Sequence, residues 1–269
     1  MDLSSRYGPW ALIAGGSQGI GLAFAQQLAA AGLNLVLLAR REEPLAQARQ
    51  SLSETYPTEV RTLAIDLTDP TLAAQVSELV HDLDVGLLIY NAGAVHGACE
   101  FLDTPLAAKE KLIALNCTGP VVLTQLLGPR MRQRGSGGIL LVSSMSGLTG
   151  GAYVASYAAT KAFDIVLAEG LWAELQPHGV DVLGLIAGAT DTPAMRDSGV
   201  DFSQNSAMSA DQVAREGLTQ LRHGPVHVAG DNNRAAAAIM RAENRRQSVA
   251  LMSAGAAHLY KLPLPDLPD

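Results

Sequence analysis

The sequence predicts a three-layer α/β fold, in which helices cover both faces of a doubly wound, mostly parallel sheet of seven strands. Short apolar runs alternate with helix-length segments along the 269 residues. The first apolar run leads through the glycine-rich stretch AGGSQGIG, residues 14–21, into a helical segment. No linker, repeat or low-complexity tract interrupts this alternation, so we expect a single domain over residues 1–269.

Each expected strand is a short apolar run of the kind that a sheet covered on both faces requires. The seven runs lie at residues 10–15, 33–39, 59–65, 85–91, 137–144, 179–187 and 225–230. Helical segments separate them, at 19–31, 43–55, 70–82, 105–133, 154–176 and 209–221. Right-handed crossovers through these helices place them on both sides of a parallel sheet.

Two segments lie outside this alternation. Residues 193–210, PAMRDSGVDFSQNSAMSA, form one long irregular stretch, and loops of that length often act as lids over a site. We therefore expect a substrate lid there. Residues 231–269 are expected to form a helical C-terminal extension that ends in the proline-rich tail LPLPDLPD.

Composition excludes several classes of protein. The net charge is −7 and like charges do not cluster, which argues against a nucleic-acid surface. The two cysteines, Cys99 and Cys117, give no disulfide framework and indicate a reducing compartment, so a cytoplasmic location is expected. The first ten residues also lack the basic and apolar blocks of a signal peptide.

One uncharged stretch, from Trp10 to Ala39, is long enough to cross a bilayer. It contains five glycines, with serine, glutamine and asparagine between them. The order is an apolar run, a glycine loop, a helix, a glycine and a second apolar run. That pattern is typical of a buried strand–helix–strand unit, so no membrane span is expected.

A metal site is not expected either. His223 and His227 are four residues apart, but Gly224 and Pro225 break any helix that would align them. No cluster of carboxylates accompanies them, and we interpret both as strand-edge histidines.

The glycine-rich stretch predicts a nucleotide site. Glycines allow a tight turn and let a pyrophosphate approach the backbone amides at the positive end of the following helix. The second strand then ends in LLARRE, where an acid would bind a ribose 2′-hydroxyl and an arginine accommodates a 2′-phosphate. This favours NADP(H) over NAD(H), with Arg40 preferred to Arg41. Asp66 follows the third strand, where it is equally suited to accepting from the adenine amino group and to capping a turn.

Four further motifs follow in chain order: YNAG at 90–93, LNCTG at 115–119, VSSMSG at 142–147 and YAATK at 157–161. Together with AGGSQGIG they resemble the short-chain dehydrogenase/reductase superfamily, whose members have a Rossmann fold, and the resemblance extends to about residue 230. Ser144 lies thirteen residues before Tyr157, the spacing usual in that family, whereas Ser143 is one residue off it. The resemblance implies a catalytic tetrad of Asn116, Ser144, Tyr157 and Lys161.

The residue types suit ketone reduction, which needs a hydride on carbon and a proton on oxygen. A tyrosine phenol ordinarily ionises only at about pH 10, so it exchanges protons slowly at neutral pH. Lys161 lies one helical turn beyond Tyr157, where an ammonium favours the phenolate and can bond the nicotinamide ribose. Ser144 would hold the substrate oxygen, and Asn116, as in the family, would support a water that links Lys161 to solvent. Taken alone, Tyr157 is better interpreted as a packed core residue, and only its combination with the other motifs favours catalysis.

The loop after the sixth strand departs from the family pattern. It reads IAGATDTPAM, with Ala187 where most relatives have proline, while Gly188 and Thr192 keep their places. We assign Thr192 to the cofactor and expect the Thr190 contact to differ. The cofactor contacts implied by the resemblance are Gly15, Ser17, Gln18, Gly19, Ile20, Gly21, Arg40, Arg41, Asp66, Leu67, Asn91, Ala92, Gly93, Tyr157, Lys161, Gly188, Thr190 and Thr192.

Within the superfamily, the stretches YGPWALIAGGSQGIGLAFA, LVLLARREEPL and MSADQVAREGL are similar to NADP-dependent reductases. That branch includes microbial hydroxysteroid dehydrogenases and 3-oxoacyl-type reductases. It implies interconversion of a secondary alcohol and a ketone, with a bulky alicyclic or steroid-like substrate first and a 3-oxoacyl or polyketide ketone as the alternative. A catalytically idle NADPH-binding scaffold is the third possibility. The expected substrate pocket comprises His96, Met145, Leu148, Tyr153, Met195 and Phe202.

The family resemblance also implies a homodimer or homotetramer. Most relatives pack through two long helices, which here correspond to residues 105–133 and 154–176. Their alanine- and leucine-rich faces suit such an interface, although a face buried in the core of the monomer has the same pattern.

Overall fold

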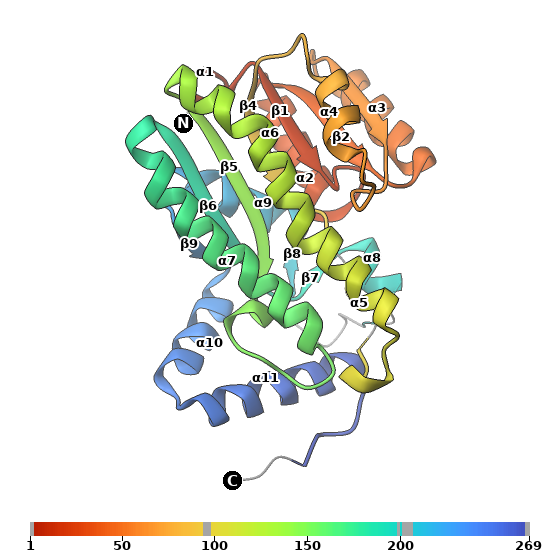
Figure 1. Ribbon diagram of the computed structural model, residues 1–269, viewed down its shortest axis with the longest axis vertical. Coiled ribbons are helices and arrows are strands. Elements are labelled where there is room, and N and C mark those ends of the chain that lie inside the picture. The colour runs from red at the N-terminus through yellow and green to blue at the C-terminus, as the bar shows by residue number, and fades with distance from the viewer. Residues whose placement is uncertain (1–2, 94–97, 198–199, 201–206, 267–269) are drawn as a thin grey trace.

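The computed structural model describes residues 3–93, 98–197, 200 and 207–266, and Figure 1 shows their arrangement. A seven-stranded sheet lies at the centre, with the strand order β3-β2-β1-β4-β5-β6-β9 and every neighbouring pair parallel. The predicted fold class is confirmed. In sheet order the strands are β3 (Val60–Ala64), β2 (Asn34–Ala39), β1 (Trp10–Ala14), β4 (Val85–Tyr90), β5 (Gly137–Ser144), β6 (Val180–Ala187) and β9 (Val226–Val228).

Helices cover both faces because successive residues of each buried strand point to opposite sides. On one face Ile13 of β1 belongs to the apolar cluster formed with α2 (Gly19–Ala30), α3 (Glu42–Thr55) and α9 (Ala210–Gln220). On the other face Leu12 packs with α4 (Leu72–Leu79), α6 (Gly119–Arg134) and α7 (Ala155–Leu175). Figure 1 shows α6 and α7 crossing this second face.

The strand order reverses at β1, whose neighbours are β2 on one side and β4 on the other. In open α/β sheets a crevice forms at this point, outside the carboxyl ends of the strands. Here the backbone amides of Asn91 and Ala92 donate to the carbonyl of Ala14, over 3.0 and 2.8 Å, and so fix the segment after β4 beside the glycine turn.

The single helix expected at 105–133 is interrupted. It consists of α5 (Leu106–Ile113), a π-helical turn (Ala114–Thr118) and α6. Such turns are often found at functional sites. Over Leu106–Arg134 this stretch is long and apolar enough to cross a membrane by length and composition. Its apolar side, including Leu123 and Leu127, packs on the sheet. The core helix of a globular protein has the same length and composition, so these two properties are weak evidence for a membrane span. The uncharged stretch from Trp10 to Ala39 forms β1, α2 and β2.

The stretch 193–210 is more regular in its described part than the sequence predicts. Helix α8 (Pro193–Asp197) begins at Pro193, and a proline is favourable in the first turn because its missing N–H would have no helical partner. Two short strands, β7 (Thr190–Asp191) and β8 (Met208–Ser209), pair with each other and join the two ends of the segment.

Elements at both ends of the chain complete the structure. The short helix α1 (Leu3–Tyr7) escapes a periodicity analysis because it has little more than one turn, yet Tyr7 is fully buried and donates to Asp181 Oδ2 over 2.8 Å. After β9 the chain forms α10 (Asp231–Ala242) and α11 (Arg245–Tyr260). Figure 1 shows these two helices beyond the carboxyl end of the sheet.

Candidate active site

A cavity of about 1300 Å³ lies at the carboxyl end of the sheet. Single small-molecule sites span roughly 300–1,000 Å³, so this cavity has room for a cofactor and a substrate together. It is lined by the glycine turn, the ends of β2, β4, β5 and β6, and by α7, α8, α9, α10 and α11.

The glycine turn forms one end of the cavity, where Gln18, Gly19 and Ile20 line it. A Cβ placed on Gly21 would lie 2.0 Å from the carbonyl oxygen of Gly15, so the close approach of helix and turn requires glycine there. The turn therefore leaves bare backbone and the first amides of α2 beside the cavity, the arrangement that suits a pyrophosphate.

The two arginines after β2 have different positions. Arg40 lines the cavity, whereas Arg41 donates to the side-chain oxygen of Gln18 and supports the turn from outside.

Asp66 and Leu67 lie outside the cavity lining. Asp66 accepts from Lys111 Nζ over 3.0 Å and from the Thr68 hydroxyl over 2.8 Å. Although burial opposes the shift, these hydrogen bonds hold the pKa of Asp66 below its usual range. Leu67 is buried in the apolar core between the sheet and α4.

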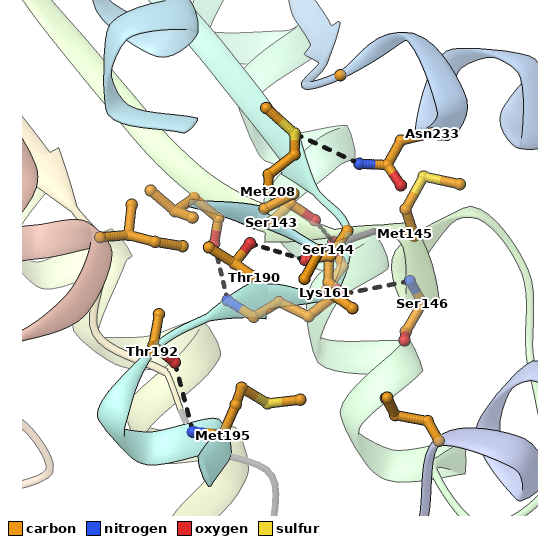
Figure 2. Close-up of a pocket in the computed structure, with 18 of the residues that line it drawn as sticks. Ser143, Ser144, Met145, Ser146, Lys161, Thr190, Thr192, Met195, Met208 and Asn233 are labelled. Carbon is orange, nitrogen blue, oxygen red and sulfur yellow. Dashed lines mark hydrogen bonds between the residues drawn. The ribbon is translucent and has the colours of Figure 1, made fainter. Parts of the chain in front are cut away.

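Two neighbouring serines end β5 with different environments. Ser143 is buried, and its hydroxyl donates to the backbone carbonyl of Lys161 over 2.7 Å. The Ser144 hydroxyl accepts from the amide of Ser146 over 3.2 Å, at the start of a 3₁₀ turn over Met145–Leu148. Figure 2 shows Ser144, Met145 and Ser146 along one side of the cavity. Both serines line the cavity, but only Ser144 has a hydroxyl not used to hold α7.

Tyr157 and Lys161 both come from α7 and both line the cavity. Lys161 is only 4% exposed, and its Nζ donates to the carbonyl of Val142 and to Asp164 Oδ2, each over 2.9 Å. Burial alone would lower the pKa of Lys161, but the charge of Asp164, with a smaller contribution from Tyr157, raises it above its usual value. Burial raises the pKa of Asp164, against the effect of Lys161.

Asn116 is fully buried in the π-helical turn, behind the cavity. A Cβ on Gly93 would lie 3.1 Å from Lys161 Nζ and 3.6 Å from Asn116 Oδ1, so these two side chains converge beside the segment after β4. The Asn116 amide donates to the Thr160 hydroxyl over 2.9 Å, and that hydroxyl donates to the carbonyl of Tyr157 over 2.9 Å.

The loop after β6 lies against the glycine turn and lines the cavity beside it. Gly188, Thr190 and Thr192 line it, and a Cβ on Gly19 would lie 3.2 Å from the methyl group of Thr192. The Thr192 hydroxyl also accepts from the amide of Met195 over 3.3 Å (Figure 2). Of the other predicted cofactor contacts, Asn91 and Gly93 line the cavity, while Gly15, Ser17, Gly21, Arg41 and Ala92 do not.

Four of the expected substrate contacts fall within the described residues, and only two of them line the cavity. Met145 and Met195 do. Leu148 instead packs against an apolar cluster beneath α10, and Tyr153 turns away to donate to the carbonyl of Pro263 over 2.8 Å. The backbone of Tyr153 has a φ of 66°, a left-handed conformation that is uncommon outside glycine. His96 and Phe202 lie outside the described residues.

Among the lining residues that sequence reasoning missed is an apolar group from the C-terminal helices α10 and α11. Their apolar character is visible in the sequence, but the surface on which they dock is not. They are Met240, Leu251, Met252, Ala256, Leu259 and Tyr260.

His227 on the edge strand β9 bonds Glu216 over 2.9 Å. Within the part of the chain that the structure describes, His, Cys, Asp and Glu form no group of three or more that could hold a metal ion.

The curated proteins that are similar to this chain include a hydroxysteroid dehydrogenase and an oxoacyl-CoA reductase. A 7beta-hydroxysteroid dehydrogenase of Clostridium sardiniense is 31% identical over 237 residues, which cover 87% of this chain and 90% of that protein. A very-long-chain 3-oxoacyl-CoA reductase of Ajellomyces capsulatus (strain NAm1 / WU24) is 37% identical over 185 residues. That match covers 66% of this chain but only 55% of the reductase, so the chain matches about half the length of that relative.

Solved structures with the same fold include the following two. One comes from a study of 7beta-hydroxysteroid dehydrogenase stereoselectivity, with a TM-score of 0.87, 28% identity, and 94% of this chain and 99% of that chain covered. The other is a short-chain dehydrogenase from Sphingobium yanoikuyae in complex with NADPH, with a TM-score of 0.74 and 33% identity, covering 82% of this chain and 86% of that chain. The family model for short chain dehydrogenase matches residues 9–201. The chain therefore belongs to the short-chain dehydrogenase/reductase superfamily of oxidoreductases.

Proposed function

We propose that the protein is an NADP(H)-dependent oxidoreductase that interconverts a secondary alcohol and a ketone. The observation that carries the proposal is one continuous cavity. Arg40 and the glycine turn line it at one end, and Ser144, Tyr157 and Lys161 line it next to apolar side chains of α11.

The residues at the nucleotide end fit NADP(H). Gly21 lies so close to the carbonyl of Gly15 that a Cβ on Gly21 has no space. A site in which backbone amides hold a pyrophosphate requires such a close turn without side chains. Arg40 lines the cavity after β2, where an arginine accommodates a 2′-phosphate. The structure from Sphingobium yanoikuyae in complex with NADPH supports this choice of cofactor. When bound, NADPH would supply the hydride that reduces the carbonyl carbon.

The protein's own residues would supply the proton that the ketone oxygen needs. Ser144 would donate a hydrogen bond to the ketone oxygen, and Tyr157 would transfer its phenolic proton to the same oxygen as negative charge develops there. The ammonium of Lys161 would stabilise the phenolate that remains. Asn116 would fix the turn of α7 that carries Tyr157 through Thr160.

We propose a bulky alicyclic or steroid-like ketone as the substrate. The cavity is wide, and Leu251, Met252 and Leu259 add apolar surface from α11, where a fused-ring substrate would lie. The similarity to 7beta-hydroxysteroid dehydrogenases over nearly the whole chain supports the same class.

A 3-oxoacyl or polyketide-type ketone is the alternative substrate. The 37% identity to a very-long-chain 3-oxoacyl-CoA reductase favours it, although that match covers only about half of the reductase. NADPH consumption should be measured with a panel of steroid ketones, other bulky ketones and 3-oxoacyl thioesters. Our proposal predicts turnover of the alicyclic ketones. Turnover of the thioesters alone would select the alternative, and NADPH binding without turnover of any ketone would indicate an idle scaffold.

We further propose a homodimer or homotetramer in a reducing, cytoplasmic compartment. Exposed apolar side chains on α5, α6 and α7, among them Ile113, Val121 and Val166, support an interface between copies. Cys99 and Cys117 are both free thiols. Light scattering coupled to size-exclusion chromatography measures the assembly. Val166→Glu should dissociate it if α7 lies in the interface, and a wild-type monomer would contradict the proposal.

A further inference from the structure

Helix α7 carries a second buried charge, three residues beyond Lys161. Asp164 Oδ2 accepts from Lys161 Nζ over 2.9 Å, and the two side chains are only 2% and 5% exposed. The other carboxylate oxygen of Asp164, Oδ1, is buried without a hydrogen-bond partner in the described part of the chain. A buried carboxylate with one oxygen unpartnered is costly, so Asp164 destabilises the fold unless Lys161 is charged.

The groups that face this pair come from three elements. Tyr90 on β4 donates to the carbonyl of Leu115 over 2.6 Å, and burial raises its pKa above the usual range. Cys117 in the π-helical turn has a pKa raised to about 11, by burial first and then by the charge of Asp164. Both groups are therefore neutral at neutral pH. Tyr157 on α7 is the remaining titratable group whose charge acts on Lys161.

We infer that Asp164 is a positioning residue for the reaction. It holds the ammonium of Lys161 in place, and its negative charge partly offsets the effect of that ammonium on the loss of the Tyr157 proton. The inference rests on the proposed roles of Tyr157 and Lys161. Lys161 also donates to the Val142 carbonyl, so two acceptors on different elements fix its Nζ between β5 and α7. Asp164 is not itself one of the residues that line the cavity, and it acts through Lys161, which is.

Asp164 has two opposing effects on the Tyr157–Lys161 pair. Its negative charge makes the first proton of the pair harder to remove, whichever group loses it. It also lies directly against Lys161, so it favours ammonium with phenolate over neutral amine with neutral phenol. Asp164→Asn should therefore lower the apparent pKa of the pair and also lower the fraction of the pair in the active, ammonium–phenolate form.

The test is the pH profile of alcohol oxidation with NADP⁺ and a 7β-hydroxysteroid. In Asp164→Asn we expect the acid limb of kcat/KM to move to lower pH by about one unit and the plateau to fall about tenfold. The ultraviolet absorbance of phenolate in the cofactor-free enzyme, taken as a difference from Tyr157→Phe, should show the same downward shift. Asp164→Ser, which leaves space for water, replaces Asp164→Asn if that variant does not fold.

Asp181→Asn is the matched control. Asp181 is also a poorly exposed aspartate with a cationic partner, Arg6, but it lies at the opposite end of β6 from the cavity. This variant should lose stability without moving either titration. An unchanged or upward-shifted midpoint in the Asp164 variants, by both readouts, would overturn the inference. Full turnover by Tyr157→Phe would overturn the proposed function instead, so the two failures are distinguishable.

Discussion

The hydroxyl of Ser143 donates to the backbone carbonyl of Lys161 over 2.7 Å, in a buried hydrogen bond that joins the end of β5 to the middle of α7. Ser144, the next residue, has its hydroxyl at the cavity instead. Adjacent serines on one strand thus have different environments, because Ser143 holds the backbone of Lys161 and Ser144 lines the cavity.

Serine-to-alanine substitutions should distinguish the two serines. Ser144→Ala should lower kcat by about 10²–10³, the usual cost of losing one donor to a developing oxyanion, with little change in stability. Ser143→Ala removes the side-chain donor to the Lys161 carbonyl, which keeps its helical partner in α7, and should lower the free energy of unfolding by about 0.5–1.5 kcal/mol. Steady-state kinetics and urea unfolding on both variants test this, and the reverse assignment of effects would contradict it.

Arg40 should determine the choice of cofactor. Arg40→Asp would remove the proposed charge-assisted contact to a 2′-phosphate, so NADPH binding should weaken about 10- to 100-fold while NADH binding changes little. Binding is measured by the fluorescence of the reduced nicotinamide. The control is Arg49→Asp, which makes the same charge change on the exposed side of α3. An unchanged preference for NADPH over NADH in Arg40→Asp would contradict the role of Arg40 in the choice of cofactor.

Gly21 should be intolerant of any side chain. Its added Cβ would lie 2.0 Å from the Gly15 carbonyl oxygen and 2.7 Å from the Asn91 amide nitrogen, so Gly21→Ala must open the turn. We expect a loss of about 1–3 kcal/mol in stability and loss of measurable NADPH binding. Gly170→Ala in α7 is the control, because a Cβ there meets nothing within 4 Å and no proline follows it. Helix propensity predicts that this change stabilises the protein by about 0.5–1 kcal/mol. Equal effects of the two substitutions would be inconsistent with a steric role for Gly21.

Glu216 should make stability depend on pH. It accepts from His227, Arg234 and the amide of Gly230. Burial opposes the shift, but these donors hold the pKa of Glu216 below its usual range. Its stabilisation is therefore complete above the unfolded-state value of about 4.3 and is lost as the pH falls through the lower folded-state value.

Glu216→Gln should accordingly cost about 1–3 kcal/mol at pH 7 and much less near pH 3. Urea unfolding at the two pH values measures the difference, with the exposed Glu174→Gln on α7 as the control. A cost that is the same at both pH values would show that the carboxylate charge is not involved.

The parallel sheet could be predicted from sequence because a strand buried on both faces is a continuous apolar run. Residues 137–144 were expected as a strand, and β5 has those bounds. The π-helical turn at Asn116 was not predicted, because its sequence has the same helical character as α5 and α6 on either side. Helix α1 was missed because its stability comes from the burial of Tyr7 and not from a periodic pattern.

The candidate site was predictable where short motifs follow strands, and much less so where distant segments meet. Ser144, Tyr157 and Lys161 line the cavity together because β5 and α7 are joined by a short connection. The contribution of Met252 and Leu259 depends on how α11 docks, which local sequence does not determine. Asp164 is visible in the sequence at three residues from Lys161, but its burial follows from the packing of α7 against the sheet.

The most direct test of the proposed function is Tyr157→Phe, which removes one oxygen atom and keeps the ring. The variant should bind NADPH with the wild-type affinity, because the glycine turn and Arg40 are unchanged. Its rate of reduction of the best ketone in the panel should fall by about 10²–10⁴, the contribution of a positioned general acid. Wild-type turnover by this variant would contradict the assignment of Tyr157 as the proton donor and, with it, the proposed mechanism.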